Sequence, residues 1–268
     1  MRLRSSIAPA VALAALALFA ACGGKPASAP PVAYDVNALP TGQLGESIKL
    51  GHDIIMDPQK YVPKSVVADM SCGACHISGG TVNRGGSLVG VYARFPQWNK
   101  RAKRVITLQD RLAECFLYSM NGTPPAYTSK EMTAMVAYIA YLSRDVPVGA
   151  KVKPGVRFVV PLPSAPPDLA HGAAIYTKSC EMCHQANGAG VHGSFPPLWG
   201  PTSFNRGAGM SHLDLMTGFV EYNMPKNAPG TLSMQDAYDV SAWVLTHARP
   251  KFAKDRTIVP PSEPASYF

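Results

Sequence analysis

The chain has 268 residues and a formal net charge of +8 at pH 7, and only 16% of its side chains are charged. This length allows one or two domains. Low charge with abundant alanine, glycine and proline indicates a compact exported protein and argues against a disordered chain. The positive charge can attract small anions or an acidic protein partner, or simply keep a basic surface soluble. We expect no nucleic-acid partner.

The first 21 residues are predicted to be a signal peptide, because Arg2 and Arg4 precede an apolar run over 7–21. No other segment of the sequence is long and apolar enough to cross a bilayer. The small residues before Cys22 are typical of a bacterial lipoprotein signal, although Phe19 stands where leucine is usual. We therefore expect a periplasmic protein with a lipid anchor on Cys22. Ordinary cleavage nearby would instead leave a free soluble protein.

A helix is expected from about Gly45 to the Asp57-Pro58 break. After it, residues 72–76 read Cys-Gly-Ala-Cys-His, and residues 180–184 repeat the pattern as Cys-Glu-Met-Cys-His. Two cysteines three apart with histidine directly after them are the attachment site of a c-type haem, with histidine as a ligand of the iron. A thioredoxin-like motif or half a zinc site would not require the histidine in both copies. The sequence thus predicts two covalently bound haem c groups, attached through Cys72, Cys75, Cys180 and Cys183, with His76 and His184 as iron ligands.

The stretch from Arg94 to Arg111 concentrates positive charge and is either an anion pocket or a solvated face. A helix over 107–120, with Thr107 as its cap, is predicted next. Arg111, Cys115 and Ser119 are four residues apart, so they would share one face of this helix. That face would offer a cation, a thiol and a hydroxyl in a row.

A second amphipathic helix is predicted over 129–142, and its methionines are expected in the core. The proline-rich stretch 147–167 is expected to be an extended linker. Helices are then predicted over 168–180 and 233–247. The fold class is therefore all-α, with two cytochrome c-like domains. The predicted division is signal peptide 1–21, tether 22–44, first domain 45–146, linker 147–167, second domain 168–250 and tail 251–268.

Met224 is the predicted sixth ligand of the second iron, because it precedes a proline shortly ahead of the last helix. Competing sulfur ligands are Met210, Met216 and Met234, and Lys226 is an alternative amine ligand. For the first iron the repeat leaves two choices. Aligning the closing helices of the two halves places Met120 opposite Met224, whereas the thiolate of Cys115, one turn earlier, binds ferric iron strongly. Cys115 could also be a buried free thiol.

Residues 71–81, 111–122 and 129–139 resemble the dihaem thiosulfate dehydrogenases in motif, order and spacing. The resemblance covers the first domain nearly end to end, and the second less distinctively. It implies His76 and Cys115 as ligands of a catalytic first haem, and Arg101, Arg111 and Ser119 at substrate-binding positions. The sequence departs from the family at Tyr118, where arginine is common, and at Asn223, where lysine would precede the methionine ligand.

The implied activity is the oxidation of two thiosulfate ions to tetrathionate, with electrons passing through the second haem to an external c-type cytochrome or similar acceptor. Two alternatives stay open. The same residues could reduce tetrathionate, or the chain could be a dihaem electron shuttle without a substrate of its own. The shuttle would leave Cys115 beside Arg111 and Ser119 unexplained.

Overall fold

The computed structural model describes residues 34–150 and 158–252, and these belong to one unit spanning Pro31–Phe268. The predicted signal peptide, lipidation site Cys22 and most of the tether lie outside the described residues. So do 151–157 of the linker and 253–268 of the tail. Within 34–150 and 158–252, no helix has the length and apolar character needed to cross a bilayer.

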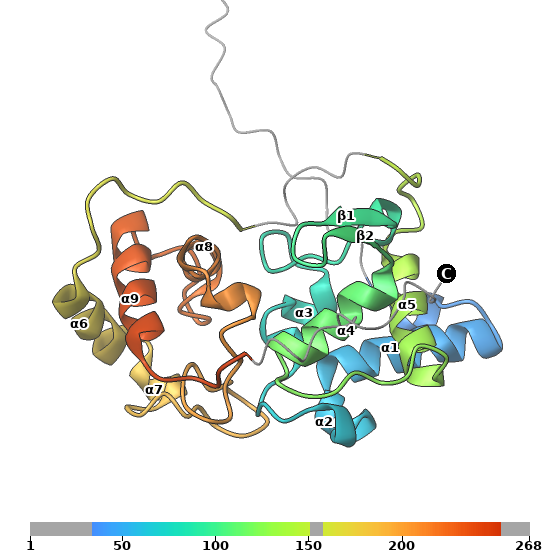
Figure 1. Cartoon of the computed structure of the whole chain (residues 1–268), viewed down its shortest axis with the longest axis horizontal. Coiled ribbons are helices and arrows are strands. Elements are labelled where there is room, and N and C mark those ends of the chain that lie inside the picture. Colours follow the sequence, from blue (N-terminus) through green and yellow to red (C-terminus); the bar gives the residue numbers. More distant parts are fainter. Residues whose placement is uncertain (1–33, 151–157, 253–268) are drawn as a thin grey trace, which may run out of the picture. The chain divides into compact units, whose positions relative to one another are not determined.

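Helices α1 (Gln43–Met56) and α5 (Lys130–Leu142) lie side by side in the first half of the chain (Figure 1). The hydroxyl of Ser129 caps α5 by accepting a hydrogen bond from the backbone N–H of Met132, 3.1 Å away. As predicted, Met132 and Met135 are buried in the core between these helices. Each buried aliphatic side chain there contributes roughly 1.5–3 kcal/mol to folding.

Helix α4 (Leu108–Tyr118) begins where the sequence predicted, directly after Thr107. The Thr107 hydroxyl accepts from the backbone N–H of Asp110, and the Asp110 carboxylate accepts from the backbone N–H of Thr107. This reciprocal capping box fixes the start of the helix. The helix that carries the row of candidate functional residues is therefore anchored by its own first turn.

The basic stretch before α4 forms a hairpin, which the all-α prediction did not include. Strands β1 (Gln97–Asn99) and β2 (Arg104–Ile106) pair antiparallel, with Trp98 opposite Val105. The four-residue turn between them holds Lys100 to Lys103, and Lys103 has a positive φ of 52°. The described chain is otherwise predominantly helical, as predicted.

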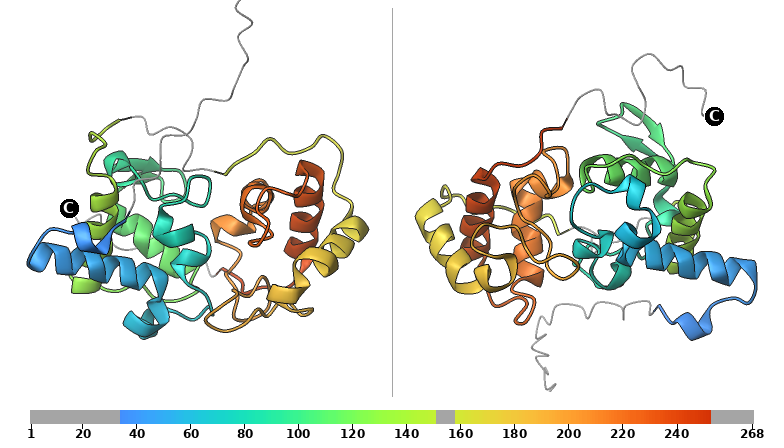
Figure 2. Two further views of the ribbon diagram at one scale, coloured as in Figure 1. Left: turned by 180° about the vertical axis from the view of Figure 1, so that it is seen from behind. Right: turned by 90° about the horizontal axis from the view of Figure 1, so that it is seen from below.

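In the second half, α6 (Leu169–Ser179) and α8 (Leu213–Asn223) both pack against α9 (Met234–Thr246) (Figure 2). Helix α8 was not predicted, although Leu213, Met216 and Val220 have helical spacing. The two halves share one packing device. A Cβ on Gly51 of α1 would clash with the backbone of α5, and a Cβ on Gly172 of α6 would clash with the backbone of α9.

Both haem motifs sit on short helical turns. The first begins as η3 (Cys72–Ala74) and is followed by α3 (Ile77–Gly80), and the second forms α7 (Glu181–His184). The remaining short elements are η1 (Val36–Ala38), α2 (Pro58–Tyr61), η2 (Pro63–Ser65), η4 (Tyr92–Arg94) and η6 (Gly209–Ser211).

Candidate active site

The two motif histidines are held in the same way. Nδ1 of His76 lies 2.5 Å from the carbonyl oxygen of Gly86, and Nδ1 of His184 lies 2.9 Å from that of Pro196. A carbonyl only accepts, so Nδ1 carries the proton and donates it, which leaves the lone pair of Nε2 available to a metal. Burial lowers the pKa of both histidines, which favours the neutral form that ligates iron.

A glycine is required in each histidine-binding loop. Gly86 has φ of 68° and Gly190 has φ of 67°, in the left-handed region. A Cβ on Gly86 would also meet the carbonyl of Cys75, and one on Gly190 would meet the carbonyl of Phe195. The absence of a Cβ at these two positions lets the loop backbone approach the motif backbone closely.

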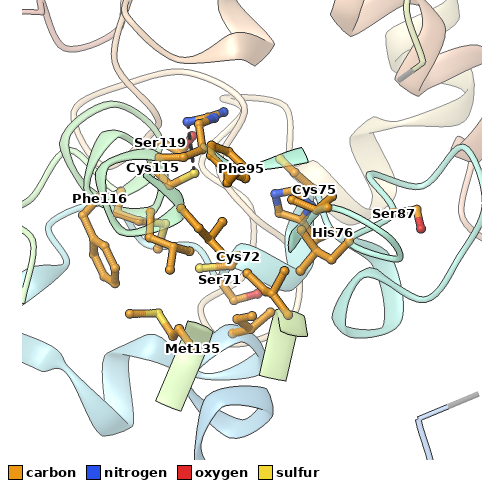
Figure 3. A pocket seen from close by; sticks show the side chains of 18 of the residues that line it. Ser71, Cys72, Cys75, His76, Ser87, Phe95, Cys115, Phe116, Ser119 and Met135 are labelled. Atoms are coloured by element: carbon orange, nitrogen blue, oxygen red, sulfur yellow. Dashed lines mark hydrogen bonds between the residues drawn. The ribbon is translucent and has the colours of Figure 1, made fainter. Parts of the chain in front are cut away.

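A cavity of about 280 Å³ opens beside the first motif. Figure 3 shows Cys115 and Ser119 on one side of it, with Cys75 and His76 on the other. Its walls are largely apolar and include Ile55, Leu88, Leu108, Phe116, Met135 and Ile139. The cysteines of the described chain are free, and burial raises the pKa of Cys72 and Cys75 to about 12. Reduced, protonated thiols beside an apolar cavity and an available imidazole fit a covalently attached haem.

The predicted row on α4 faces this cavity. Arg111, Cys115 and Ser119 all line it, so the structure brings the three together as the spacing predicted. Nη1 of Arg111 lies 3.4 Å from Sγ of Cys115. The negative charge of the Cys115 thiolate raises the pKa of Arg111, and the charge of Glu114 acts in the same direction. A cation and a sulfur nucleophile are thus paired at the cavity wall.

Met120 also lines the cavity and is 1% exposed. Because both Cys115 and Met120 contribute to the wall, both stand near the space that the first haem would occupy. The choice of Cys115 as the sixth ligand therefore stays a prediction.

Arg101 is not among the residues that line the cavity. Its Nη2 donates to the carbonyl of Gly207 at 2.9 Å, and its guanidinium lies over the ring of Tyr118, 4.2 Å from the ring centre. Arg94 and Gln97, neither of which was a predicted site residue, line the cavity instead. Arg94 belonged to the predicted basic stretch, so its charge was the available signal.

A buried carboxylate beside this site was also missed. Glu114 is 4% exposed and lies 3.5 Å from Nη1 of Arg111. Its position three residues after an arginine on a helix was the signal that could have found it. The side-chain amide of Asn99 donates to both oxygens of this carboxylate, a contact that local sequence could not reveal.

The second site has a different environment. Burial raises the pKa of Cys180 to about 11. Met224 directly follows α8, and the competing Met216 is buried in the core at 3% exposure. The amide of Asn223 donates to the carbonyls of Arg84 and Phe219, at 2.9 and 3.0 Å. Met224 as sixth ligand stays a prediction.

Two motif histidines with available Nε2 atoms, each beside a pair of free thiols in a mostly helical half, define a dihaem c-type cytochrome. Residues 60–148 match the SoxA/TsdA cytochrome c domain, and residues 169–248 match the cytochrome c family. These matches confirm the two predicted cytochrome domains and two covalently bound haem c groups.

The similar proteins narrow this class. The chain is 41% identical to a thiosulfate dehydrogenase of Allochromatium vinosum, over 83% of this chain and 87% of that protein. It is 37% identical to one of Stutzerimonas stutzeri, over 83% and 73%. A solved thiosulfate dehydrogenase (TsdBA) of Marichromatium purpuratum matches with a TM-score of 0.76 and 32% identity, covering 82% of this chain but 49% of that one. The chain belongs to the thiosulfate dehydrogenase family.

Proposed function

We propose that the protein oxidises two thiosulfate ions to tetrathionate at the first haem. The two electrons released pass through the second haem to an external c-type cytochrome or similar acceptor. The observation that carries the proposal is the row of Arg111, Cys115 and Ser119 on the wall of a cavity that His76 also lines. Figure 3 shows Cys115 and Ser119 across this cavity from His76. The thiosulfate dehydrogenases similar to this chain support it.

The electrostatic problem of this reaction is to bring two dianions together. Two unit charges 4 Å apart already repel by about 4 kcal/mol at an effective dielectric constant near 20. Arg111 supplies a positive charge at the cavity wall, where it can offset this repulsion. Arg101 is the proposed second cation. Its hydrogen bond to the carbonyl of Gly207 leaves the guanidinium charge in place, because a carbonyl oxygen carries no net charge.

Orientation is the second requirement. The contact of Nη1 of Arg111 with Sγ of Cys115, 3.4 Å long, keeps the arginine and the sulfur together at the cavity wall. This holds a reactive sulfur beside the bound anion, where it can approach the outer sulfur of thiosulfate. The Ser119 hydroxyl, one turn further on, donates to a sulfonate oxygen. When bound, the first haem supplies an electron acceptor next to these groups, with Cys115 and His76 as its proposed ligands.

The second half serves electron exit in this proposal. His184 and Met224 would hold the second haem iron, and neutral thioether ligation would raise its reduction potential. This division of labour assigns 45–146 to catalysis and 168–250 to transfer, with 147–167 as the linker between them. The same residues could catalyse tetrathionate reduction, and the potentials of haem and partner would then decide the direction.

We also propose that the protein is exported to the periplasm and anchored through lipid on Cys22. A Cys22→Ser variant should then move from the membrane fraction to the soluble periplasmic fraction with both haems attached. Membrane retention of that variant would contradict the lipid anchor.

The central test compares Cys115→Ala with Met120→Leu in the haem-loaded protein. The electron paramagnetic resonance spectrum of the oxidised wild type should show a low-spin thiolate-haem signal beside a His/Met signal. Cys115→Ala should lose the thiolate signal and thiosulfate-dependent reduction while keeping both haems. Met120→Leu replaces a side chain of similar volume, so it should retain both. Two His/Met signals in the wild type, or full activity in Cys115→Ala, would favour the plain electron shuttle.

A further inference from the structure

The side chain of Asn99 makes contacts on both of its ends at the base of the hairpin. Its Nδ2 donates to both oxygens of the Glu114 carboxylate, at 3.1 and 3.2 Å. Its Oδ1 accepts from the backbone N–H groups of Arg101 and Ala102, at 2.8 and 3.0 Å. One short side chain thus joins the hairpin turn to helix α4.

We infer that Asn99 is a positioning residue, which acts through Glu114 to hold the guanidinium of Arg111 at the cavity wall. The inference rests on the proposed function, because it takes Arg111 as the group that binds the substrate anion. The contacts form a continuous series. Asn99 holds Glu114, Glu114 lies 3.5 Å from Nη1 of Arg111, and the same Nη1 lies 3.4 Å from Sγ of Cys115.

The burial of Glu114 makes its contacts with Asn99 and Arg111 necessary for stability. A carboxylate that is 4% exposed must be paired, because an unpaired buried charge is strongly destabilising. Its described partners are the Asn99 amide on one side and the Arg111 guanidinium on the other. The bidentate amide fixes the carboxylate, and the fixed carboxylate restricts where the guanidinium can lie.

Arg111 needs such a restraint because its side chain is long. Holding an arginine in one rotamer costs conformational entropy. If the restraint exists before the anion binds, the entropy is already lost in the free protein and does not weaken substrate binding. Small changes in the position of such a group slow the reaction strongly, since a shift of about 1 Å can lower the rate roughly a hundredfold.

The other end of Asn99 extends the same control to the second proposed cation. By accepting from the N–H groups of Arg101 and Ala102, its Oδ1 forms an Asx-type turn that starts the loop of the hairpin. Asn99 therefore contacts the backbone of Arg101 directly and the guanidinium of Arg111 through Glu114.

The experiment uses substitutions that separate the two ends. Asn99→Asp keeps an acceptor for the turn but replaces the amide donor with an oxygen that repels Glu114. Glu114→Gln removes the charge that faces Arg111. In the double variant N99D/E114Q, the new glutamine amide can donate to the new aspartate, so the link is restored with its polarity reversed. Asn187→Asp is the matched control, because Asn187 Oδ1 accepts from the N–H of Ala189 in a similar turn.

All variants are measured as haem-loaded full-length protein with thiosulfate. We expect N99D and E114Q each to lower kcat/KM roughly tenfold or more, mainly through a higher KM. The double variant should recover the Tm lost in N99D while its kcat/KM stays near that of E114Q alone, because both changes act on one series of contacts. Asn187→Asp should leave KM unchanged. Wild-type KM in N99D, or independent multiplication of the two single effects, would overturn the inference.

A readout without substrate separates this inference from the proposed function. Absence of thiosulfate-dependent activity in the wild type would contradict the function alone. The contact of Arg111 with Cys115 would still be perturbed in N99D, so the resonance signal of the first haem should shift in N99D and not in Asn187→Asp. An unchanged signal in N99D would contradict the positioning role whatever the substrate is.

Discussion

The two halves of the molecule hold their motif histidines alike but present different chemistry around them. In each half a glycine-containing loop lets a backbone carbonyl accept from Nδ1 of the motif histidine, His76 or His184. In each half a glycine on the leading helix allows close packing against the closing helix. The first half adds α4 with its arginine, thiol and hydroxyl, whereas in the second half α8 leads to a methionine. The repeated unit carries the haem-attachment motif, and in the proposed function the helix before the closing helix supplies the groups that distinguish the two sites.

Two buried acids, one from each half, show the same division, whereas Asp110, also buried in the first half, belongs to the capping box of α4. Glu114 in the first half lies beside the cavity wall and contacts Arg111. Asp239 in the second half is 1% exposed and accepts from His171 and from the backbone N–H of Asp168, where α6 meets α9. One acid therefore supports a site, and the other supports helix packing.

The largest expected effect separates a site arginine from a structural one. Arg111→Ala should lower kcat/KM for thiosulfate by roughly a hundred- to a thousandfold, the usual loss for one donor to a developing charge. Arg249 instead donates to the carbonyls of Leu198 and Val244. Arg249→Lys should lower Tm and leave kcat/KM near that of the wild type. Steady-state kinetics and thermal unfolding of both variants test these two roles. Near wild-type kinetics in Arg111→Ala would show that Arg111 does not take part in the reaction.

The histidine-binding loops offer the next test. Gly86→Ala and Gly190→Ala should each cost about 1–3 kcal/mol, because both positions have positive φ and no room for a Cβ. Gly86→Ala should slow reduction of the first haem by thiosulfate. Gly190→Ala should leave that step intact and slow transfer to the external acceptor. Stopped-flow absorbance can follow the two steps, and identical kinetic defects in both variants would argue against the proposed division of labour.

Capping provides a smaller contrast of the same kind. Thr107 caps α4, and Ser233 caps α9 with an equivalent capping box. Loss of either hydroxyl by substitution with alanine should cost about 1 kcal/mol of unfolding free energy. Only Thr107→Ala should also raise KM for thiosulfate, since α4 carries Arg111 and Cys115. Chemical denaturation and steady-state kinetics test this, and a raised KM in Ser233→Ala would contradict the expectation that only the cap of α4 affects substrate binding.

The smallest expected effect is a pH dependence at the start of α4. Burial alone would raise the pKa of Asp110, but hydrogen bonds from Arg104 and Tyr127 hold it below its ordinary value of 3.8. A lowered carboxyl pKa stabilises the fold above the unfolded pKa, and this contribution is lost as pH falls through the folded pKa. Asp110→Asn should therefore be less stable than the wild type at neutral pH, and the gap should narrow below about pH 4. Urea unfolding at neutral pH and below pH 4 measures this difference in stability. A difference that does not change with pH would show that it does not come from the ionised carboxylate.

Much of this could be predicted from local sequence. The haem motifs, the capping of α4 by Thr107 and of α5 by Ser129, and the shared face of Arg111, Cys115 and Ser119 all depend on residues a few positions apart. Short-range spacing fixes such features because helix geometry repeats every few residues. The hairpin and α8 were missed, since basic residues in a turn and a short apolar pattern carry weak local signals.

Only the tertiary structure decided what surrounds that row. The carbonyl that holds His76 comes from a residue ten positions away, and the amide that holds Glu114 comes from one fifteen positions away. It also placed Met120 beside Cys115 on the cavity wall and turned Arg101 toward Gly207. Such contacts form between segments whose approach depends on the packing of the whole unit, so the sequence determined which reactive groups the protein has, and the fold decided which of them meet.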